Sequence, residues 1–203
     1  MSPLRSLVAV EPPVHRHEGP KGAHALQNLA LLLKDRGELD EAEALLHRVL
    51  EIERRQFGEE HPNRATNLYH LGLIHRDAGR QQEAESFFQQ AADLYRQTLS
   101  DDHPWVSFPL LTLGELHLEQ GDSKAAEPLL RESVRLRKAA LGADNPLTAL
   151  AESALGDCLA ASGRHREAEP LLRSSTRLLE DTYGPDDRRT VWARERVERW
   201  LGG

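Results

Sequence analysis

Ten histidines and a single cysteine are the side chains of this 203-residue chain with the chemistry for metal binding or nucleophilic attack. A structural zinc site needs four His, Cys or carboxylate ligands, usually supplied as closely spaced pairs. The closest histidine pair is His15 and His17, and no set of thiols or carboxylates is spaced to complete a site with it. We therefore expect neither a metal site nor a cofactor.

Two other histidines occupy positions that resemble core positions. His75 and His117 lie 42 residues apart, and one further step of 42 in either direction reaches Leu33 and Leu159. A position that holds leucine in some units and histidine in others is typical of packing or of the edge of a core. We interpret both histidines as packing residues rather than as ligands.

Cys158 belongs to a similar column. The positions that precede it at steps of 42 residues are Leu116, Ile74 and Leu32. Reactive cysteines need an electropositive and partly exposed environment, so this column favours a buried, inert thiol over a nucleophile. A single cysteine cannot form an internal disulfide, which fits a reducing compartment.

Paired carboxylates could act as general acid and base in catalysis. Glutamates recur in pairs such as Glu41 with Glu43 and Glu83 with Glu85. Residues two positions apart on a helix do not share a face, so these pairs are poor acid–base partners. The chain also carries no glycine-rich phosphate loop and no nucleophile motif. We therefore expect that it is not an enzyme; a reaction centre would have to be built in a groove.

A period of 42 residues organises the chain. Five columns keep this step: Gly37, Gly79, Gly121 and Gly163; Ala42, Ala84, Ala126 and Ala168; Glu43, Glu85, Glu127 and Glu169; Leu29, Leu71, Leu113 and Leu155; Pro20, Pro62, Pro104 and Pro146. A fixed period of about 20–50 residues indicates an array of one supersecondary unit. Function is then expected to come from a shared surface rather than from one catalytic pocket.

Each unit predicts two helices, which we name helix A and helix B. Helix A of the first unit has its apolar stripe at helical spacing and ends before Gly37; the stripe consists of Leu26, Leu29, Leu32 and Leu33. Helix B follows with its own stripe, which begins at Ala42. Small residues recur where the two helices must approach closely, at Ala30, Gly72, Gly114 and Gly156.

The motifs of the first unit are Asn28-Leu29-Ala30, Gly37, the stretch from Glu41 to Leu46 and the loop from Phe57 to Pro62. They resemble the tetratricopeptide repeat, in the 42-residue form found in kinesin light chain and its many bacterial relatives. The resemblance implies an all-α fold: a right-handed α-solenoid of helix-turn-helix units with a C-terminal capping helix. HEAT and armadillo repeats have similar lengths, but the glycine and alanine columns favour the tetratricopeptide repeat.

The repeat register also sets the expected boundaries. We expect an N-terminal tail or degenerate half repeat at 1–21, repeats at 22–63, 64–105, 106–147 and 148–189, and a capping helix at 190–203. Pro12 and Pro13 argue against a long helix in the first segment. The mixed charge of the last segment suits a helix that covers the exposed face of the fourth unit.

The composition limits the classes of partner. A net charge of −7 argues against nonspecific nucleic-acid binding, which needs a basic face. No apolar run approaches the about 18 residues that cross a bilayer, and the short segment before Glu11 does not predict a signal peptide. We therefore expect a cytoplasmic protein without a membrane partner. Arginine greatly outnumbers lysine, which favours a bacterial source of high GC content.

The resemblance implies that helix A lines a concave groove that binds peptides. The positions that match the groove of the family are His24, Gln27, Asn28, Lys34, Tyr69, His70, Arg76, Phe108, Leu111, Thr112, Glu115, Leu118, Leu150, Asp157 and Trp192. Hydrogen-bond donors dominate the N-terminal half of this set and apolar side chains the C-terminal half. We expect a protein or peptide ligand with acidic and apolar parts. The alternative is that these side chains are simply solvated or covered by neighbouring units.

The residues with which the family binds two known ligand classes are present only in part or are missing. Asn28 corresponds to the groove asparagine of kinesin light chain, but His70, Thr112 and Ala154 replace it in later units. The carboxylate clamp of chaperone-binding relatives is missing, because Gln27 and Leu31 stand at its lysine and asparagine positions. We do not expect binding to chaperone C-termini.

The function that these observations favour is a non-catalytic scaffold or adaptor for protein–protein interaction. Two alternatives remain: a peptide-sensing regulatory module of a larger signalling protein, and a structural array that self-assembles end to end. We expect a monomer, and light scattering over a concentration series distinguishes it from the self-assembling array.

Overall fold

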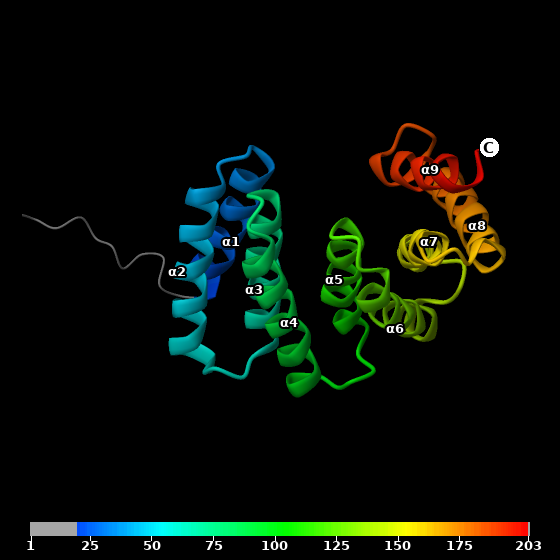
Figure 1. Cartoon of the computed structure of the whole chain (residues 1–203). Coiled ribbons are helices and arrows are strands. Elements are labelled where there is room, and N and C mark those ends of the chain that lie inside the picture. Colours follow the sequence, from blue (N-terminus) through cyan, green and yellow to red (C-terminus); the bar gives the residue numbers. More distant parts are fainter. Residues whose placement is uncertain (1–19, 203) are drawn as a thin grey trace, which may run out of the picture. The chain divides into compact units, whose positions relative to one another are not determined.

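The computed structural model describes residues 20–202, which contain nine α-helices, one 3-10 helix and no β-strand (Figure 1). The predicted all-α solenoid of helix hairpins is confirmed. The histidine pair at 15 and 17 and residues 1–19 of the predicted N-terminal tail or half repeat lie outside the described residues, while residues 20 and 21 belong to the first helix. The helices are α1 (Pro20–Asp35), α2 (Leu39–Phe57), α3 (Pro62–Asp77), α4 (Gln81–Thr98), η2 (Pro104–Val106), α5 (Ser107–Glu119), α6 (Ser123–Leu141), α7 (Pro146–Ala161), α8 (His165–Tyr183) and α9 (Arg188–Leu201).

The chain divides into two compact units, Met1–Gly58 and Glu59–Gly203. In the first unit α1 packs against α2, with Ala23 and Leu26 of α1 in contact with the cluster of Val49 and Ile52. One predicted feature is wrong here, because two members of the apolar stripe of helix A are exposed.

Those two residues are Leu29 and Leu32, which are 46% and 62% exposed. The physical reason is that α2 covers the face of α1 that carries Ala23, Leu26 and Ala30, and not the neighbouring face. In the second unit the corresponding leucines Leu71, Leu113 and Leu155 are buried, as the stripe predicts; these leucines have relative exposures of 0%, 2% and 4%.

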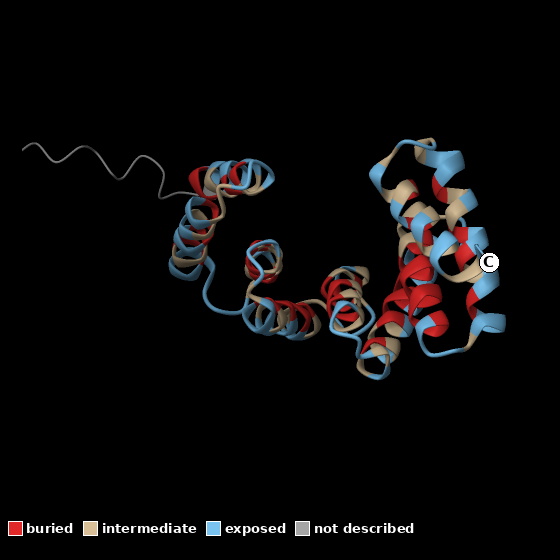
Figure 2. Cartoon of the chain, turned by 45° about the horizontal axis from the view of Figure 1, so that its top comes forward, coloured by how far each residue is buried: buried red, intermediate tan, exposed pale blue. Residues whose placement is uncertain are grey.

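In the second unit the helices pack in chain order, as antiparallel pairs of helix A (α3, α5, α7) and helix B (α4, α6, α8). Successive A helices also touch directly, α5 with α7 and α7 with α9. Figure 2 shows that buried residues concentrate where helices face one another, while the connecting loops are exposed. Because α7 has neighbours on several sides, every residue from 151 to 160 is buried.

Three glycines of helix A let helix B approach closely. A Cβ atom added at Gly72 would lie 2.5 Å from Cε1 of Phe88, and one at Gly114 would lie 2.6 Å from Cγ of Leu130. Gly156 has the same relation to Leu172, at 2.8 Å. The small-residue column predicted from the sequence therefore marks the places where the two layers of helices meet.

The capping helix departs from this column. One period after Gly156 stands Glu198, whose side chain on α9 is exposed. Glu198 thus replaces the small residue that lets helix B approach helix A closely in the second unit. Helix α9 thus offers the packing surface of helix A toward α7 and α8, and a charged surface on its other side.

The loops that lead from helix B to the next helix A carry a column of N-cap residues. His61, His103, Asn145 and Asp187 each accept a hydrogen bond from the backbone N–H two residues later. The histidines do so through Nδ1, over 3.2 Å. His61 and His103 therefore act as helix caps.

We expect Gly114→Ala to destabilise the second unit by about 1–2 kcal/mol, because the clash with Leu130 exceeds the gain in helix propensity. The measurement is urea unfolding of the variant, of Leu130→Ala and of the double variant. Truncating Leu130 removes the clash. The double variant should therefore lose less free energy of unfolding than the sum of the losses of the two single variants. Strict additivity would show that the glycine is not needed for the close approach.

We expect His103→Ala to cost about 1 kcal/mol of unfolding free energy, since the N–H of Trp105 loses its acceptor. His103→Asn should stay close to the original chain, because Asn145 performs the same role two loops later. Thermal unfolding of both variants provides the comparison. Equal losses for alanine and asparagine would assign the effect to the ring contact between His103 and Trp105 instead of the cap.

Candidate functional site

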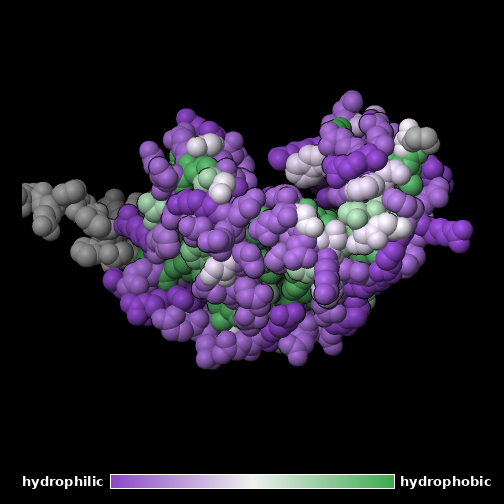
Figure 3. Space-filling model, in the orientation of Figure 1, coloured by the Kyte–Doolittle hydropathy of each residue, from purple (hydrophilic) through white to green (hydrophobic). Residues whose placement is uncertain are grey.

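The second unit contains a cavity of about 600 Å³ that lies among its A helices. The C-terminal ends of α3, α5 and α7 form one side and α9 forms the other, and Figure 3 shows the surface hollowed beside α9. The lining residues are Arg76, Asp77, Glu115, Leu118, Glu119, Asp157, Ala161, Arg188, Trp192, Glu195, Arg196, Arg199 and Trp200. They combine an indole surface with many charged groups.

One arginine joins three A helices along the wall of this cavity. Nη2 of Arg196 donates to Oε1 of Glu115 over 2.8 Å, and Nη1 donates to the hydroxyl of Ser153 over 3.2 Å. Nε of Arg196 lies 3.3 Å from Oδ2 of Asp157. The guanidinium group on α9 thereby contacts side chains of both α5 and α7.

Asp157 receives two further donors from α9. Nη1 of Arg199 lies 3.2 Å from its Oδ1, and the indole Nε1 of Trp200 donates to the same oxygen over 2.6 Å. Asp157 is buried, and its charge is compensated by the arginines around it. The carboxylates of Glu115 and Asp157 therefore hold the wall together and are not open to an incoming cation.

Two cations of the cavity have no such partner. Within residues 20–202, neither Arg76 nor Arg188 forms an ion pair with a carboxylate at 4.0 Å or less. The guanidinium of Arg188 lies over the ring of Trp192, 4.2 Å from its centroid, and Trp192 is 44% exposed. A guanidinium stacked on an aromatic ring keeps its donors for another acceptor.

Glu119 is the carboxylate of the cavity whose protonation is most affected by its surroundings. Burial raises its pKa, Arg76 opposes this shift and the nearby Glu115 adds to it. It is the last residue of α5, where the helix dipole also disfavours a negative charge. Glu119 is therefore easier to protonate than an exposed glutamate.

The structure brings five of the predicted groove residues together on this cavity: Arg76, Glu115, Leu118, Asp157 and Trp192. Four others lie on α1 in the first unit and do not line it: His24, Gln27, Asn28 and Lys34. Their place in a binding groove stays a prediction.

The remaining predicted residues of the second unit are held in packing contacts. Tyr69 and Thr112 share a hydrogen bond of 3.3 Å between their hydroxyls, and burial raises the pKa of Tyr69. Leu111 and Leu150 pack against core clusters, and His70 is half-buried. These contacts give part of the predicted set a role in packing, and their place in a groove stays a prediction.

Phe108 has a specific structural role of this kind. The guanidinium of the buried Arg137 lies 4.9 Å from the centroid of its ring. Arg137 donates to the hydroxyl of Ser107 and to the carbonyl of Leu147, over 3.0 Å and 2.6 Å. Burial lowers the pKa of Arg137 to about 10. Phe108 thus covers a buried cation that ties α6 to α5 and α7.

Arg188, Arg199 and Trp200 are among the lining residues that the predicted groove positions do not include. For Arg199 a signal was present: at steps of 42 residues, Glu115 and Asp157 are followed by Arg199. Opposite charges in one column predict attraction between successive A helices. Arg188 had no such signal, because its stacking on Trp192 depends on the start of α9.

Among residues 20–202, no group of three or more His, Cys, Asp or Glu side chains is arranged to hold a metal ion. None of the described helices is both long and apolar enough to cross a membrane.

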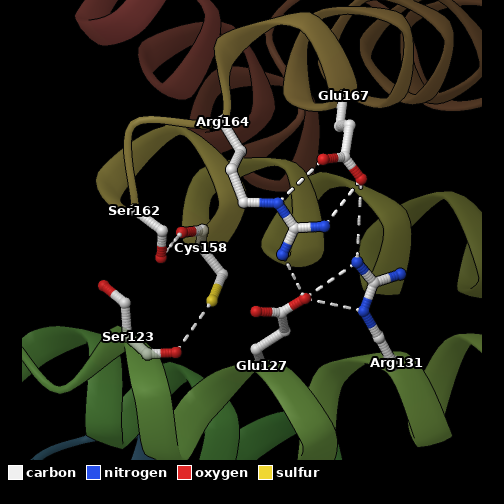
Figure 4. Close-up of polar contacts among 7 residues, drawn as sticks. All are labelled: Ser123, Glu127, Arg131, Cys158, Ser162, Arg164 and Glu167. Carbon is white, nitrogen blue, oxygen red and sulfur yellow. Dashed lines mark hydrogen bonds and ion pairs between the residues drawn. The ribbon is translucent and has the colours of Figure 1, made fainter.

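Cys158 on α7 is buried in a hydrophobic core cluster, beside a set of polar contacts between α6 and α8 (Figure 4). Its Sγ donates to the carbonyl of Ser123 over 3.3 Å. Beside it, Arg164 binds Glu127 over 2.6 Å and Glu167 over 2.7 Å. Burial, reinforced by Glu127 and Asp157, raises the pKa of the Cys158 thiol to about 11.

We expect Cys158 to react with Ellman's reagent at pH 8 at least about 100-fold more slowly in the folded chain than in urea. The reason is that the folded thiol is both buried and almost entirely protonated. The unfolded chain is the control for reagent and buffer. A folded rate close to the unfolded rate would contradict the closed environment.

Comparison with known proteins identifies the repeats. A family model described as tetratricopeptide repeat matches residues 23–97, 82–139 and 125–181. No curated protein matches the chain significantly. Among solved structures, the nearly identical TPR-like repeats of a kinesin light chain from Podosopora anserina share 23% identity and a TM-score of 0.71, over 91% of this chain and 88% of that one.

Two further structures share the fold. BtubC (BKLC) from P. vanneervenii has 21% identity and a TM-score of 0.71, covering 84% of this chain and 69% of that one. YrrB, a TPR protein with an unusual peptide-binding site, has 19% identity and a TM-score of 0.55, covering 92% and 89%. Because the family model spans most of the chain, the chain belongs to the tetratricopeptide repeat family. Its fold is similar to that of the kinesin light chain repeats and of BtubC.

Proposed function

We propose that this chain is a non-catalytic adaptor that binds a peptide segment of a partner protein in the cavity between α3, α5, α7 and α9. Tetratricopeptide repeat proteins serve in general as scaffolds for protein–protein interaction. YrrB, which shares the fold, carries a peptide-binding site. The cavity volume of about 600 Å³ is that of a site for a few side chains of a peptide.

The observation that carries the proposal is the combination of an exposed indole with two arginines that lack carboxylate partners among the described residues. Trp192 provides apolar contact area, while Arg76 and Arg188 provide donors for carboxylates. Exposed tryptophan and arginine are the residue types that contribute most to binding energy at interfaces. The matching ligand has an apolar side chain beside an acidic one.

The acidic groups of the cavity do not oppose this ligand. Arg196 and Arg199 compensate Glu115 and Asp157, and the raised pKa of Glu119 eases its neutralisation. We further propose that the protein acts as a monomer in the cytoplasm, where a single buried thiol remains reduced.

The test is a selection of displayed peptides on the purified chain, followed by affinity measurements on the selected peptides. We expect Trp192→Ala to weaken their binding by about 10- to 30-fold, as for a central interface residue. Trp105→Ala is the matched control, because Trp105 is a similarly exposed tryptophan of the same unit, at 46%, and does not line the cavity. Circular dichroism verifies that both variants fold.

The same peptides also test whether the acidic side chain of the ligand contributes to binding. Replacing the Asp or Glu of these peptides by Asn or Gln should weaken their binding to the original chain. The same replacement should change their binding to the Arg76→Gln variant only a little. Selected peptides that bind the Trp192 and Trp105 variants equally would place the site elsewhere. A selection without any enriched peptide would contradict the adaptor proposal.

A further inference from the structure

A solenoid normally has contacts only between adjacent repeats, and its curvature follows from the small rotation at each junction. The second unit has one polar contact that skips a repeat. Within residues 20–202, the ion pair between Arg196 and Glu115 is the hydrogen-bonded contact that joins α9 directly to α5. The two residues are 81 positions apart in the sequence.

The position of this pair favours a strong interaction. The side chain of Arg196 is only 16% exposed and that of Glu115 only 27%, so solvent screens the pair less than it screens a surface salt bridge. Ser153 and Asp157 of α7 hold the other nitrogens of the guanidinium. Arg196 is thus fixed by the intermediate helix at the same time as it reaches the distant one.

We propose that Arg196 and Glu115 form an ionic latch that holds α9 toward α5 and sets the width of the cavity. Arg196 is a positioning residue in this device, since the side chains that it places are Arg188 and Trp192 on α9. Their opposite wall consists of Arg76 on α3 and Leu118 on α5. The latch exists in the chain without a ligand, so it does not depend on the proposed function.

Glu115 is the side chain that can be changed without removing the adjacent contact. Helix α9 keeps its packing on the preceding repeat through Val197, Trp200 and Leu201, and Arg196 keeps Ser153 and Asp157. Glu115→Gln has nearly the same shape and removes only the negative charge. This variant is therefore expected to fold and to open the latch.

Glu119→Gln is the matched control. Glu119 lies one turn further along α5 and lines the same cavity, and it has no ion pair within 4.0 Å among the described residues. Neutralising it changes the charge of the cavity by the same amount as Glu115→Gln. A specific latch and a general electrostatic effect thus give different results.

The experiment measures the distance between spin labels on Lys124→Cys in α6 and Glu198→Cys in α9, which are both exposed positions. The buried Cys158 is expected to stay unlabelled. Labelling of the original chain, whose single cysteine is Cys158, verifies this. We expect a narrow distance distribution in the original chain and in Glu119→Gln. The distribution of Glu115→Gln should shift to longer distances and broaden.

Salt provides an independent arm of the same experiment. About 1 M NaCl shortens the Debye length to about 3 Å, so it should shift the original chain part of the way toward the distribution of Glu115→Gln, because a partly buried pair is only partly screened. The shift of Glu115→Gln itself should be smaller, because this variant has lost the pair with Glu115 and keeps the ion pairs of α9 to Asp157. Identical distributions for Glu115→Gln and the original chain, or equal shifts for the two glutamine variants, would overturn the latch.

Discussion

Each helix pair of the second unit depends on one close contact, where a glycine of helix A leaves room for a large side chain of helix B. Gly72 meets Phe88 and Gly114 meets Leu130, at distances that an added methyl group could not occupy. This contact brings the two layers together, and the layers then bury the leucine columns between them. Because the contact recurs every 42 residues, successive A helices lie beside one another and can form a common surface.

That common surface changes character along the chain. Around Phe108, a buried arginine from helix B is covered and hydrogen-bonded, so the surface there serves packing. Toward α9, the carboxylates of Glu115 and Asp157 meet arginines of the last helix, and the walls of a cavity result. The capping helix therefore both closes the core and contributes half of the candidate site.

Several features could be predicted from residue identity and spacing alone. The small-residue column at Gly114 and the aliphatic column that contains Cys158 each imply packing, because a repeated position with a repeated size needs a repeated neighbour. Other features depended on which surface remains uncovered. Leu29 and Leu71 belong to the same column, yet Leu29 is 46% exposed and Leu71 is buried. A periodic pattern cannot distinguish these two outcomes.

By itself the sequence determined the repeat, the two-helix unit, the stop at each turn glycine and the family, since all of these follow from local periodicity and side-chain size. Only the tertiary structure decided which groove positions share a cavity and which charges are already compensated. Arg196 illustrates the reason: its partner Glu115 is 81 residues away, and nothing local to either residue predicts their contact. Distances between repeats depend on how the helices stack, and stacking is a sum of many contacts that no single column contains.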